Sequence, residues 1–341
     1  MFKKYKARRS TNPLFVIFRL VLSLAMFALL LGGAYTAYKH FSGLDPLKLD
    51  PQSILKQVIS AKTPPQLLAI FSTLKIDPKM ISADTKMLGQ TTNETSPSNT
   101  GKTAFRFMLV ADSHSDNANL RKAITQAKEK YPDLSFIIGL GDYTDVGTIA
   151  ELKNAKKELD SSGLRYFVIV GDHDLWDSRD KGNQAVANFK QIFGPLYQSF
   201  TFQNFKFLLL DNSDNYVGLG QEQQNWINTE LEKDKTEGNK GIFVFIHEPL
   251  FHPSSDHFMG RVEKNLKLQA QSLTFQLRSA GVKKVFSGDI HYFSEYEEPT
   301  TKLEMVTIGA VLTDRNPQVP RYGIVNVLED GSTKVEDVEI K

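Results

Sequence analysis

Short apolar runs alternate with longer stretches of helical periodicity from residue 103 onward. The apolar runs predict strands and the stretches between them predict helices. The expected strands are 105–111, 134–140, 164–170, 241–246, 283–288, 303–311, 321–328 and 334–340, with a hairpin over 197–211. The expected helices are 117–131, 148–163, 183–194, 220–234 and 264–281. Because alternating strands and helices pack as buried sheet between helical layers, residues 103–341 predict one layered α/β domain.

The first hundred residues follow a different pattern. Residues 20–38 form an uncharged apolar run, and at about 1.5 Å per residue it nearly matches a hydrocarbon layer of about 30 Å. Basic residues precede it, so the positive-inside rule predicts a cytoplasmic tail over 1–19, a transmembrane anchor over 20–38 and the remainder outside the cytoplasm. Residues 39–102 predict a juxtamembrane stalk that ends in a polar linker.

Two other interpretations of the apolar run are open. A cleaved signal peptide would use residues 20–31 as its apolar part and Gly32 and Ala34 as the small residues before the cut. A buried helix of a soluble domain would show an amphipathic period, which this run does not have. We therefore expect a single-pass protein of the cell membrane with an extracytoplasmic C-terminal domain, or a secreted protein if the run is cleaved.

Charge and composition narrow the classes of function. The chain has 41 Lys and Arg against 39 Asp and Glu, a formal net charge of +2, so no nucleic-acid surface is evident. It has no cysteine, which excludes disulfides, thiolate zinc sites and a cysteine nucleophile. Any metal must therefore be held by His, Asp, Glu or Asn.

Acidic and histidine residues are concentrated where the apolar runs end. The five motifs are "ADSH" with Asp112 and His114, "GDYTD" with Asp142 and Asp145, "GDHD" with Asp172, His173 and Asp174, "IHEP" with His247, and "GDIH" with Asp289 and His291. Ligands of open α/β sheets bind beyond the carboxyl ends of the strands, so we expect these loops to converge at one edge. That many carboxylates at close range require a counter-charge, which metal ions would supply.

Taken in order, the five motifs resemble those of the calcineurin-like dinuclear metallophosphoesterases: D-x-H, G-D-x-x-D, G-N-H-D/E, a lone His and G-H-x-H. The resemblance implies a four-layer sandwich, with two mixed sheets flanked by helices, and two metals bridged by one carboxylate. It implies that Asp112, His114 and His291 bind the first metal, that Asp142 bridges, and that His247 binds the second metal.

Two positions depart from the family pattern. Asp172 stands where the family has Asn, and Asp289 stands where it has the first His of G-H-x-H. Both residues would bind the second metal, and its site would then be rich in hard oxygen donors. Such donors favour Mn, Mg, Ca or ferric iron. We expect two metal ions and leave Mn, Fe, Mg and Zn open. The added negative charge predicts a preference for phosphodiesters over dianionic monoesters.

The resemblance implies hydrolysis of a phosphoester by a metal-bound hydroxide, with His173 as general acid and Asp145 as the carboxylate that orients it. The expected partner is a phosphorylated substrate, for which the membrane tether favours a lipid or a cell-envelope intermediate. One alternative is a non-catalytic or single-metal binding protein on the same fold, because Asp172 and Asp289 replace the family residues. A non-phosphate hydrolase with the same metal pair is another.

Some residues outside the motifs have ordinary structural explanations. Solvated loop positions, surface arginines and core packing account for them. They are His252, His257 and Arg261 in the loop after His247, Arg315 and Arg321 near the C-terminus, and Trp226 in the helix expected over 220–234.

Overall fold

The computed structural model of the protein describes residues 101–341. The predicted cytoplasmic tail, the transmembrane anchor over 20–38 and nearly all of the stalk lie outside the described residues. Within residues 101–341, every helix is too short or too polar to cross a bilayer.

Five strands form the first sheet, in the order β11-β10-β1-β2-β3. β1, β2 and β3 run parallel, whereas β10 and β11 are antiparallel to their neighbours. Their bounds are β1 Thr103–Val110, β2 Leu134–Gly139, β3 Tyr166–Val168, β10 Arg321–Leu328 and β11 Thr333–Glu339. The sheet is therefore mixed, as predicted, and it carries three of the motifs at the carboxyl ends of its parallel strands.

Six strands form the second sheet, in the order β4-β5-β6-β7-β9-β8. β5, β6, β7 and β9 are parallel, and the edge strands β4 and β8 are antiparallel. The bounds are β4 Gln198–Phe202, β5 Phe205–Leu209, β6 Gly241–Phe245, β7 Val282–Ser287, β8 Ser294–Glu297 and β9 Glu304–Thr307. β4 and β5 are joined by Gln203 and Asn204, both at positive φ, which confirms the predicted hairpin.

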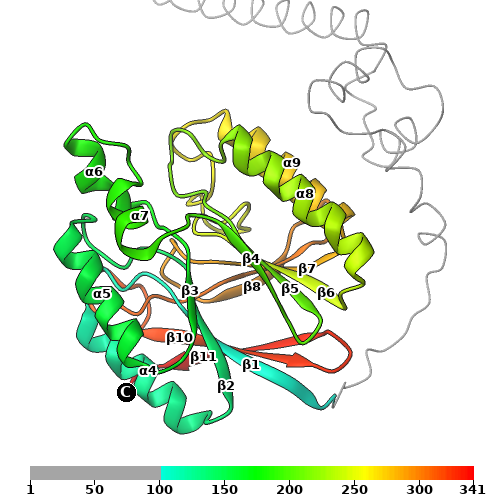
Figure 1. The fold of residues 1–341 in the computed structure, drawn as a ribbon, viewed down its shortest axis with the longest axis horizontal. Coiled ribbons are helices and arrows are strands. Elements are labelled where there is room, and N and C mark those ends of the chain that lie inside the picture. Colours follow the sequence, from blue (N-terminus) through cyan, green and yellow to red (C-terminus); the bar gives the residue numbers. More distant parts are fainter. Residues whose placement is uncertain (1–100) are drawn as a thin grey trace, which may run out of the picture. The chain divides into compact units, whose positions relative to one another are not determined.

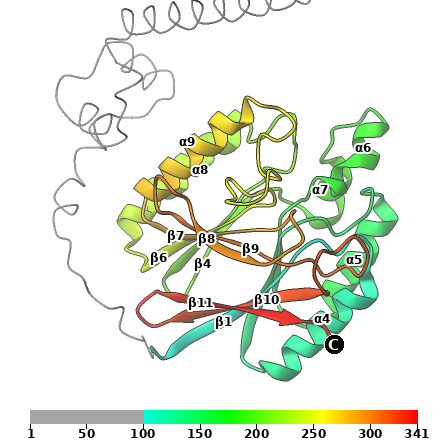
Figure 2. The same ribbon diagram turned by 180° about the vertical axis from the view of Figure 1, so that it is seen from behind.

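Helices cover the outer face of each sheet, so the domain has four layers (Figure 1). The helices are α4 Asn117–Lys130, α5 Ile149–Ser161, α6 Trp176–Asp180, α7 Ala187–Phe193, α8 Gln221–Glu237 and α9 Leu266–Ser279. α4, α5 and part of α7 pack on the first sheet, and α8 and α9 pack on the second (Figures 1 and 2). The predicted four-layer sandwich of two mixed sheets is confirmed.

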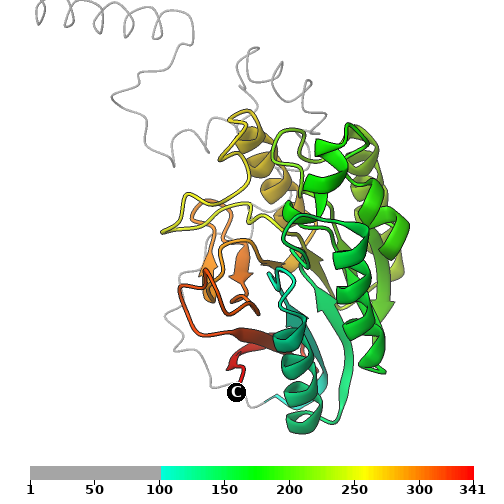
Figure 3. The same cartoon turned by 90° about the vertical axis from the view of Figure 1, so that its left-hand side faces the viewer.

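The sheets face each other across a core rich in phenylalanine. β1 illustrates the cause: Phe105, Phe107 and Leu109 point between the sheets, while Met108 and Val110 point toward α4 and α5. Successive strand residues face opposite sides, so a strand buried on both faces is apolar throughout. The side view in Figure 3 shows the strands of both sheets ending toward the same group of loops.

Some elements are shorter than the sequence predicts. The strand expected over 303–311 ends at Thr307, because residues 308–312 cross from the second sheet to the first. The Ile308 N–H donates to the Ser287 oxygen, and the Val311 N–H donates to the Ala111 oxygen (both from the main chain). The helix expected over 183–194 begins only at Ala187. The strand β8 was not expected, since its alternation of half-buried and exposed residues belongs to a short, charged edge.

Candidate metal centre

Loops from both sheets bring the five motifs together. One cluster contains Asp112, His114 and His291, each with a ligand-type atom within 4.8 Å of the others. His114 Nε2 lies 3.2 Å from His291 Nε2 and 3.5 Å from Asp142 Oδ2. Asp112 and His114 are buried, so these atoms face one another away from bulk solvent.

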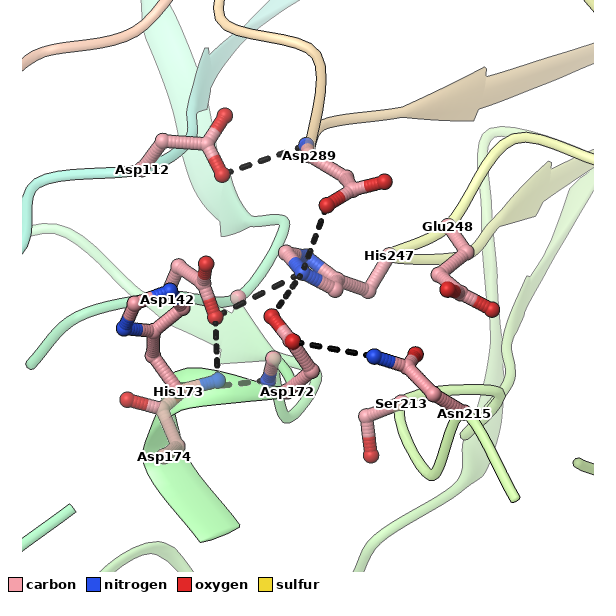
Figure 4. Close-up of polar contacts among 12 residues, drawn as sticks. Asp112, Asp142, Asp172, His173, Asp174, Ser213, Asn215, His247, Glu248 and Asp289 are labelled. Atoms are coloured by element: carbon pink, nitrogen blue, oxygen red, sulfur yellow. Dashed lines mark hydrogen bonds and ion pairs between the residues drawn. The ribbon is translucent and has the colours of Figure 1, made fainter. Parts of the chain in front are cut away.

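A second cluster lies on the other side of Asp142 and contains Asp172, His247 and Asp289 (Figure 4). His247 Nε2 is 3.4 Å from Asp142 Oδ1, 3.6 Å from Asp172 Oδ1 and 4.0 Å from Asp289 Oδ1. Asp142 thus turns one carboxylate oxygen toward His114 and the other toward His247. Its side chain therefore lies between the two clusters and contacts a histidine of each.

Local backbone conformation holds these side chains in place. Asp112, His114, Asp142, Asp289 and His291 all have positive φ, between 40° and 68°. The left-handed region is uncommon for residues other than glycine and tends to persist at functional sites, where surrounding structure imposes it. In two of these loops the turns bring alternate residues, Asp112 and His114 or Asp289 and His291, to the clusters.

Two motif glycines permit the loops to approach closely. A Cβ on Gly171 would lie 2.1 Å from both the main-chain nitrogen and Oδ1 of Asp142. Gly141 has a φ of 95°, and a Cβ there would lie 2.6 Å from His247 Nδ1. Any larger residue at either position would push apart side chains of the two clusters.

Several buried polar atoms in the clusters lack a hydrogen-bond partner. Asp112 Oδ2 and His247 Nε2 are both buried and unpartnered. His247 Nδ1 lies 2.8 Å from the Leu140 carbonyl oxygen, which only accepts, so Nδ1 carries a proton and Nε2 is the ring nitrogen left to face the second cluster. An unpartnered buried acceptor is costly in a folded protein, and a bound cation would satisfy it.

The electrostatics of the clusters also favour a cation. Burial raises the pKa of Asp112 and raises that of Asp142 well above its usual range. Burial and then the nearby His173 imidazole lower the pKa of His114 to about 2, so its ring is neutral at physiological pH. Burial alone would lower the pKa of His247, but Asp142 and Asp172 raise it well above normal, so these carboxylates favour a positive charge at Nε2, which a bound metal ion would supply in place of a proton. Neutral imidazoles and hard carboxylate oxygens are the donors that Mn, Fe, Mg and Zn accept, so the residues fit two metal ions.

His173 lies at the rim of the first cluster. Its ring packs edge-on against His114, with ring centroids 4.5 Å apart, and stacks on Trp176 at 3.9 Å. Its Nδ1 lies 2.8 Å from the main-chain oxygen of Asp145 and donates to it. The Asp145 carboxylate instead pairs with Arg315 Nη2 at 2.9 Å. The orienting contact assigned to the Asp145 carboxylate is therefore made by its carbonyl oxygen.

Asp174 supports the site without facing either cluster. It is buried, and its carboxylate accepts hydrogen bonds from the N–H and hydroxyl of Thr144 and from the Gly171 N–H, at 2.8 to 3.1 Å. Burial raises the pKa of Asp174 to about 6. Asp174 joins the loop after β2 to the loop after β3 and so fixes Asp142 relative to Asp172.

A sixth strand-end loop, which lies outside the five motifs, also reaches the site. It follows β5 and reads "DNSDN", residues 211–215. Asn215 Nδ2 donates to Asp172 Oδ2 at 3.0 Å, and Asn212 Oδ1 accepts from the His247 N–H at 2.9 Å. The signal was present, since an apolar run ends there too, but a loop of asparagines and aspartates is also typical of a solvated turn.

The remaining candidates lie in different surroundings. His252 is buried beside Tyr292 and Tyr296, and Arg321 pairs with Asp337 on β11 at 2.7 Å. Trp226 packs against Tyr197 at the edge of the core beneath α8, as core packing predicts. His257 is different, because its Nδ1 lies 2.9 Å from Asp289 Oδ2.

The four-layer fold and the two adjoining clusters define a class of α/β proteins whose strand-end loops fit two metal ions. The sequence profile described as "Calcineurin-like phosphoesterase" matches residues 105–293, more than half of the chain. The chain belongs to this family, whose members are hydrolases that act on phosphoester bonds.

Curated relatives match part of the chain. Serine/threonine-protein phosphatase CPPED1 of Mus musculus is 28% identical over 169 residues, 47% of this chain and 51% of the relative. The 3',5'-cyclic-nucleotide phosphodiesterase alr5338 of Nostoc sp. is 24% identical over 225 residues, 62% of this chain and 79% of the relative. The chain spans about half the length of the first of these.

Solved structures share the fold. A dimetal phosphatase from Danio rerio has a TM-score of 0.54 at 16% identity, covering 70% of this chain and 98% of that one. A purple acid phosphatase from yellow lupin has a TM-score of 0.53 at 15% identity, covering 70% of this chain and 52% of that one. At these identities the likeness concerns the fold alone.

Proposed function

We propose that the protein hydrolyses a phosphoester at a site that holds two metal ions. The observation that carries this proposal is the position of Asp142, with one oxygen 3.5 Å from His114 Nε2 and the other 3.4 Å from His247 Nε2. A carboxylate shared by two buried ligand sets is the arrangement needed to hold two cations close together.

The two ligand sets divide the motif residues. The first ion would be held by Asp112, His114, His291 and Asp142, and the second by Asp142, Asp172, His247 and Asp289. When bound, the ions would supply Lewis-acid activation of the phosphoester and of the attacking water. Protonated His173, held through Nδ1 by Asp145, would give its Nε2 proton to the departing alkoxide.

The charge of the site favours a substrate with a single negative charge at phosphorus. Two divalent ions carry +4, and the carboxylates of Asp112, Asp142, Asp172 and Asp289 carry −4, which leaves a formal charge of zero. Such a site attracts a dianionic monoester less than a site with two fewer carboxylates would. We therefore favour a phosphodiester. A membrane-tethered enzyme would meet lipid head groups and cell-envelope intermediates most often.

The test uses the full-length chain in detergent and a pair of nitrophenyl substrates. We expect hydrolysis of bis(p-nitrophenyl) phosphate to exceed that of p-nitrophenyl phosphate, to stop after EDTA treatment and to return with Mn²⁺. In Asp172→Asn with Asp289→His, which restores the family residues, the ratio should shift toward the monoester by about tenfold or more. An unchanged ratio would contradict the charge argument, and the absence of all hydrolysis would contradict the function.

A single-metal binding protein is the second candidate, and one observation favours it. Asp172 Oδ2 accepts from Asn215 and Asp289 Oδ2 accepts from His257, so neither carboxylate can give both oxygens to the second ion. One metal ion per chain with no turnover would support this alternative.

We further propose that residues 1–19 are cytoplasmic and that the catalytic domain lies outside the cytoplasm, tethered by residues 20–38. The chain has no cysteine, so single introduced cysteines report topology cleanly. A membrane-impermeant maleimide should label Ser332→Cys, at an exposed position, on intact cells and should label Ser10→Cys only after lysis. The reverse pattern would contradict this orientation, and a shortened protein in the medium would indicate a cleaved signal.

A further inference from the structure

Residues 246–265, the segment between β6 and α9, contact the second cluster through His257. His257 Nδ1 lies 2.9 Å from Asp289 Oδ2, and the side chain of Asp289 is only 7% exposed against 36% for His257. A carboxylate only accepts, so Nδ1 carries the proton and donates it to Asp289. Asp289 is one of the two positions where this chain departs from the family motif.

The position of His257 is fixed by the segment that carries it. Met259, two residues further on, is fully buried in the core beneath α8 and α9, and its N–H donates to the Pro249 oxygen at 2.9 Å. The His257 N–H donates to Ser255 Oγ at 3.1 Å. Gly260 has a φ of 91°, and a Cβ there would lie 2.5 Å from Lys267. The segment is therefore anchored to the core directly after His257.

The contact determines which oxygen of Asp289 faces the second cluster. Oδ2 accepts the hydrogen bond from His257. Figure 4 shows the other oxygen, Oδ1, which points toward His247 Nε2 at 4.0 Å. An aspartate has two equivalent oxygens and a broad rotation about its last bond, so without a partner either oxygen could turn toward the second cluster. His257 removes that freedom.

We propose that His257 is a positioning residue for the second metal ion: it holds Asp289 with Oδ1 toward the ion and so adapts the site to a carboxylate where the family uses imidazole. The inference rests on the proposed two-metal site. Groups that hydrogen-bond a metal ligand fix the orientation of that ligand. Loss of such a group typically weakens metal binding by about 10–100-fold.

The experiment measures Mn²⁺ binding to the full-length chain in detergent, by competition with a chromophoric chelator and by elemental analysis. His257→Ala should keep the first ion and weaken the second by about 10–100-fold. His257→Asn should restore most of that affinity, because its side-chain amide can place a donor near the position of Nδ1. Lys264→Ala, an exposed change in the same segment, is the matched control and should bind as the wild type does.

A second background separates positioning from direct ligation. In Asp289→His, removal of His257 should change the affinity for the second ion by less than about twofold, because the carboxylate that it positions is gone. Failure of Asn to restore affinity, together with a large effect of His257→Ala in Asp289→His, would show that His257 binds the ion itself. Unchanged affinity in His257→Ala would also overturn the proposal. A wild type that binds two Mn²⁺ without hydrolysing any phosphoester would overturn the proposed function alone.

Discussion

Replacing Asp142 with asparagine should lower kcat/KM for a phosphodiester by at least about 10⁴-fold, equal to about 5.5 kcal/mol of transition-state stabilisation. Asp142 is the carboxylate that faces both His114 and His247. Asparagine is neutral and offers only one acceptor oxygen, so it cannot serve two cations. The metal content, measured by elemental analysis, should fall from two ions per chain to one or fewer.

Stability measurements distinguish this effect from misfolding. Asparagine can still accept the hydrogen bond that the His173 N–H now gives to Asp142 Oδ1. Burial raises the pKa of Asp142, so a charge at this position opposes folding when no cation is bound. The metal-free variant should therefore unfold at a higher temperature than the metal-free wild type at neutral pH, while Mn²⁺ should stabilise it much less.

Asp160→Asn is the matched control, since Asp160 is exposed on α5 and its carboxylate pairs with Lys156 and Tyr166. It should leave metal content and kcat/KM within about twofold of the wild type. An Asp142→Asn protein that retained two ions and most of its activity would show that the clusters do not share this carboxylate.

The layered fold could be predicted because burial leaves a strong pattern in the chain. Strands such as β1, with Phe107 facing one core and Met108 the other, are apolar throughout and stand out between amphipathic helices. The site followed from the same pattern, since each motif begins where an apolar run ends. Parallel strands then required these ends to meet at one edge.

Contacts made by main-chain atoms and by ordinary loops could not be predicted. Nothing in the residue type of Asp145 indicates that its carbonyl, and not its carboxylate, orients His173. The crossing of residues 308–312 from one sheet to the other also depends on long-range pairing, so a local pattern predicted a longer strand. Asn215 and His257 contact the site from loops whose composition fits solvent equally well.

The role of His173 follows from its contacts, and its test depends on the leaving group. His173→Ala should lower kcat by about 10²–10⁴-fold for a diester with an alkyl leaving group, which needs a proton as it departs. The same variant should lose less than about tenfold on bis(p-nitrophenyl) phosphate, because nitrophenolate leaves without protonation. Metal content should remain at two ions per chain. Loss of metal would instead assign His173 as a ligand, a role that its proximity to His114 and Asp142 permits.

Asp145→Asn is the informative companion to His173→Ala. The substitution keeps the main-chain carbonyl oxygen of residue 145, which accepts from His173 Nδ1. It removes only the side-chain carboxylate that pairs with Arg315. That ion pair is exposed, so its loss should change stability by no more than about 1 kcal/mol. We expect kcat for the alkyl diester to fall less than about tenfold. A loss as large as that of His173→Ala would show that the Asp145 carboxylate itself orients the imidazole during turnover.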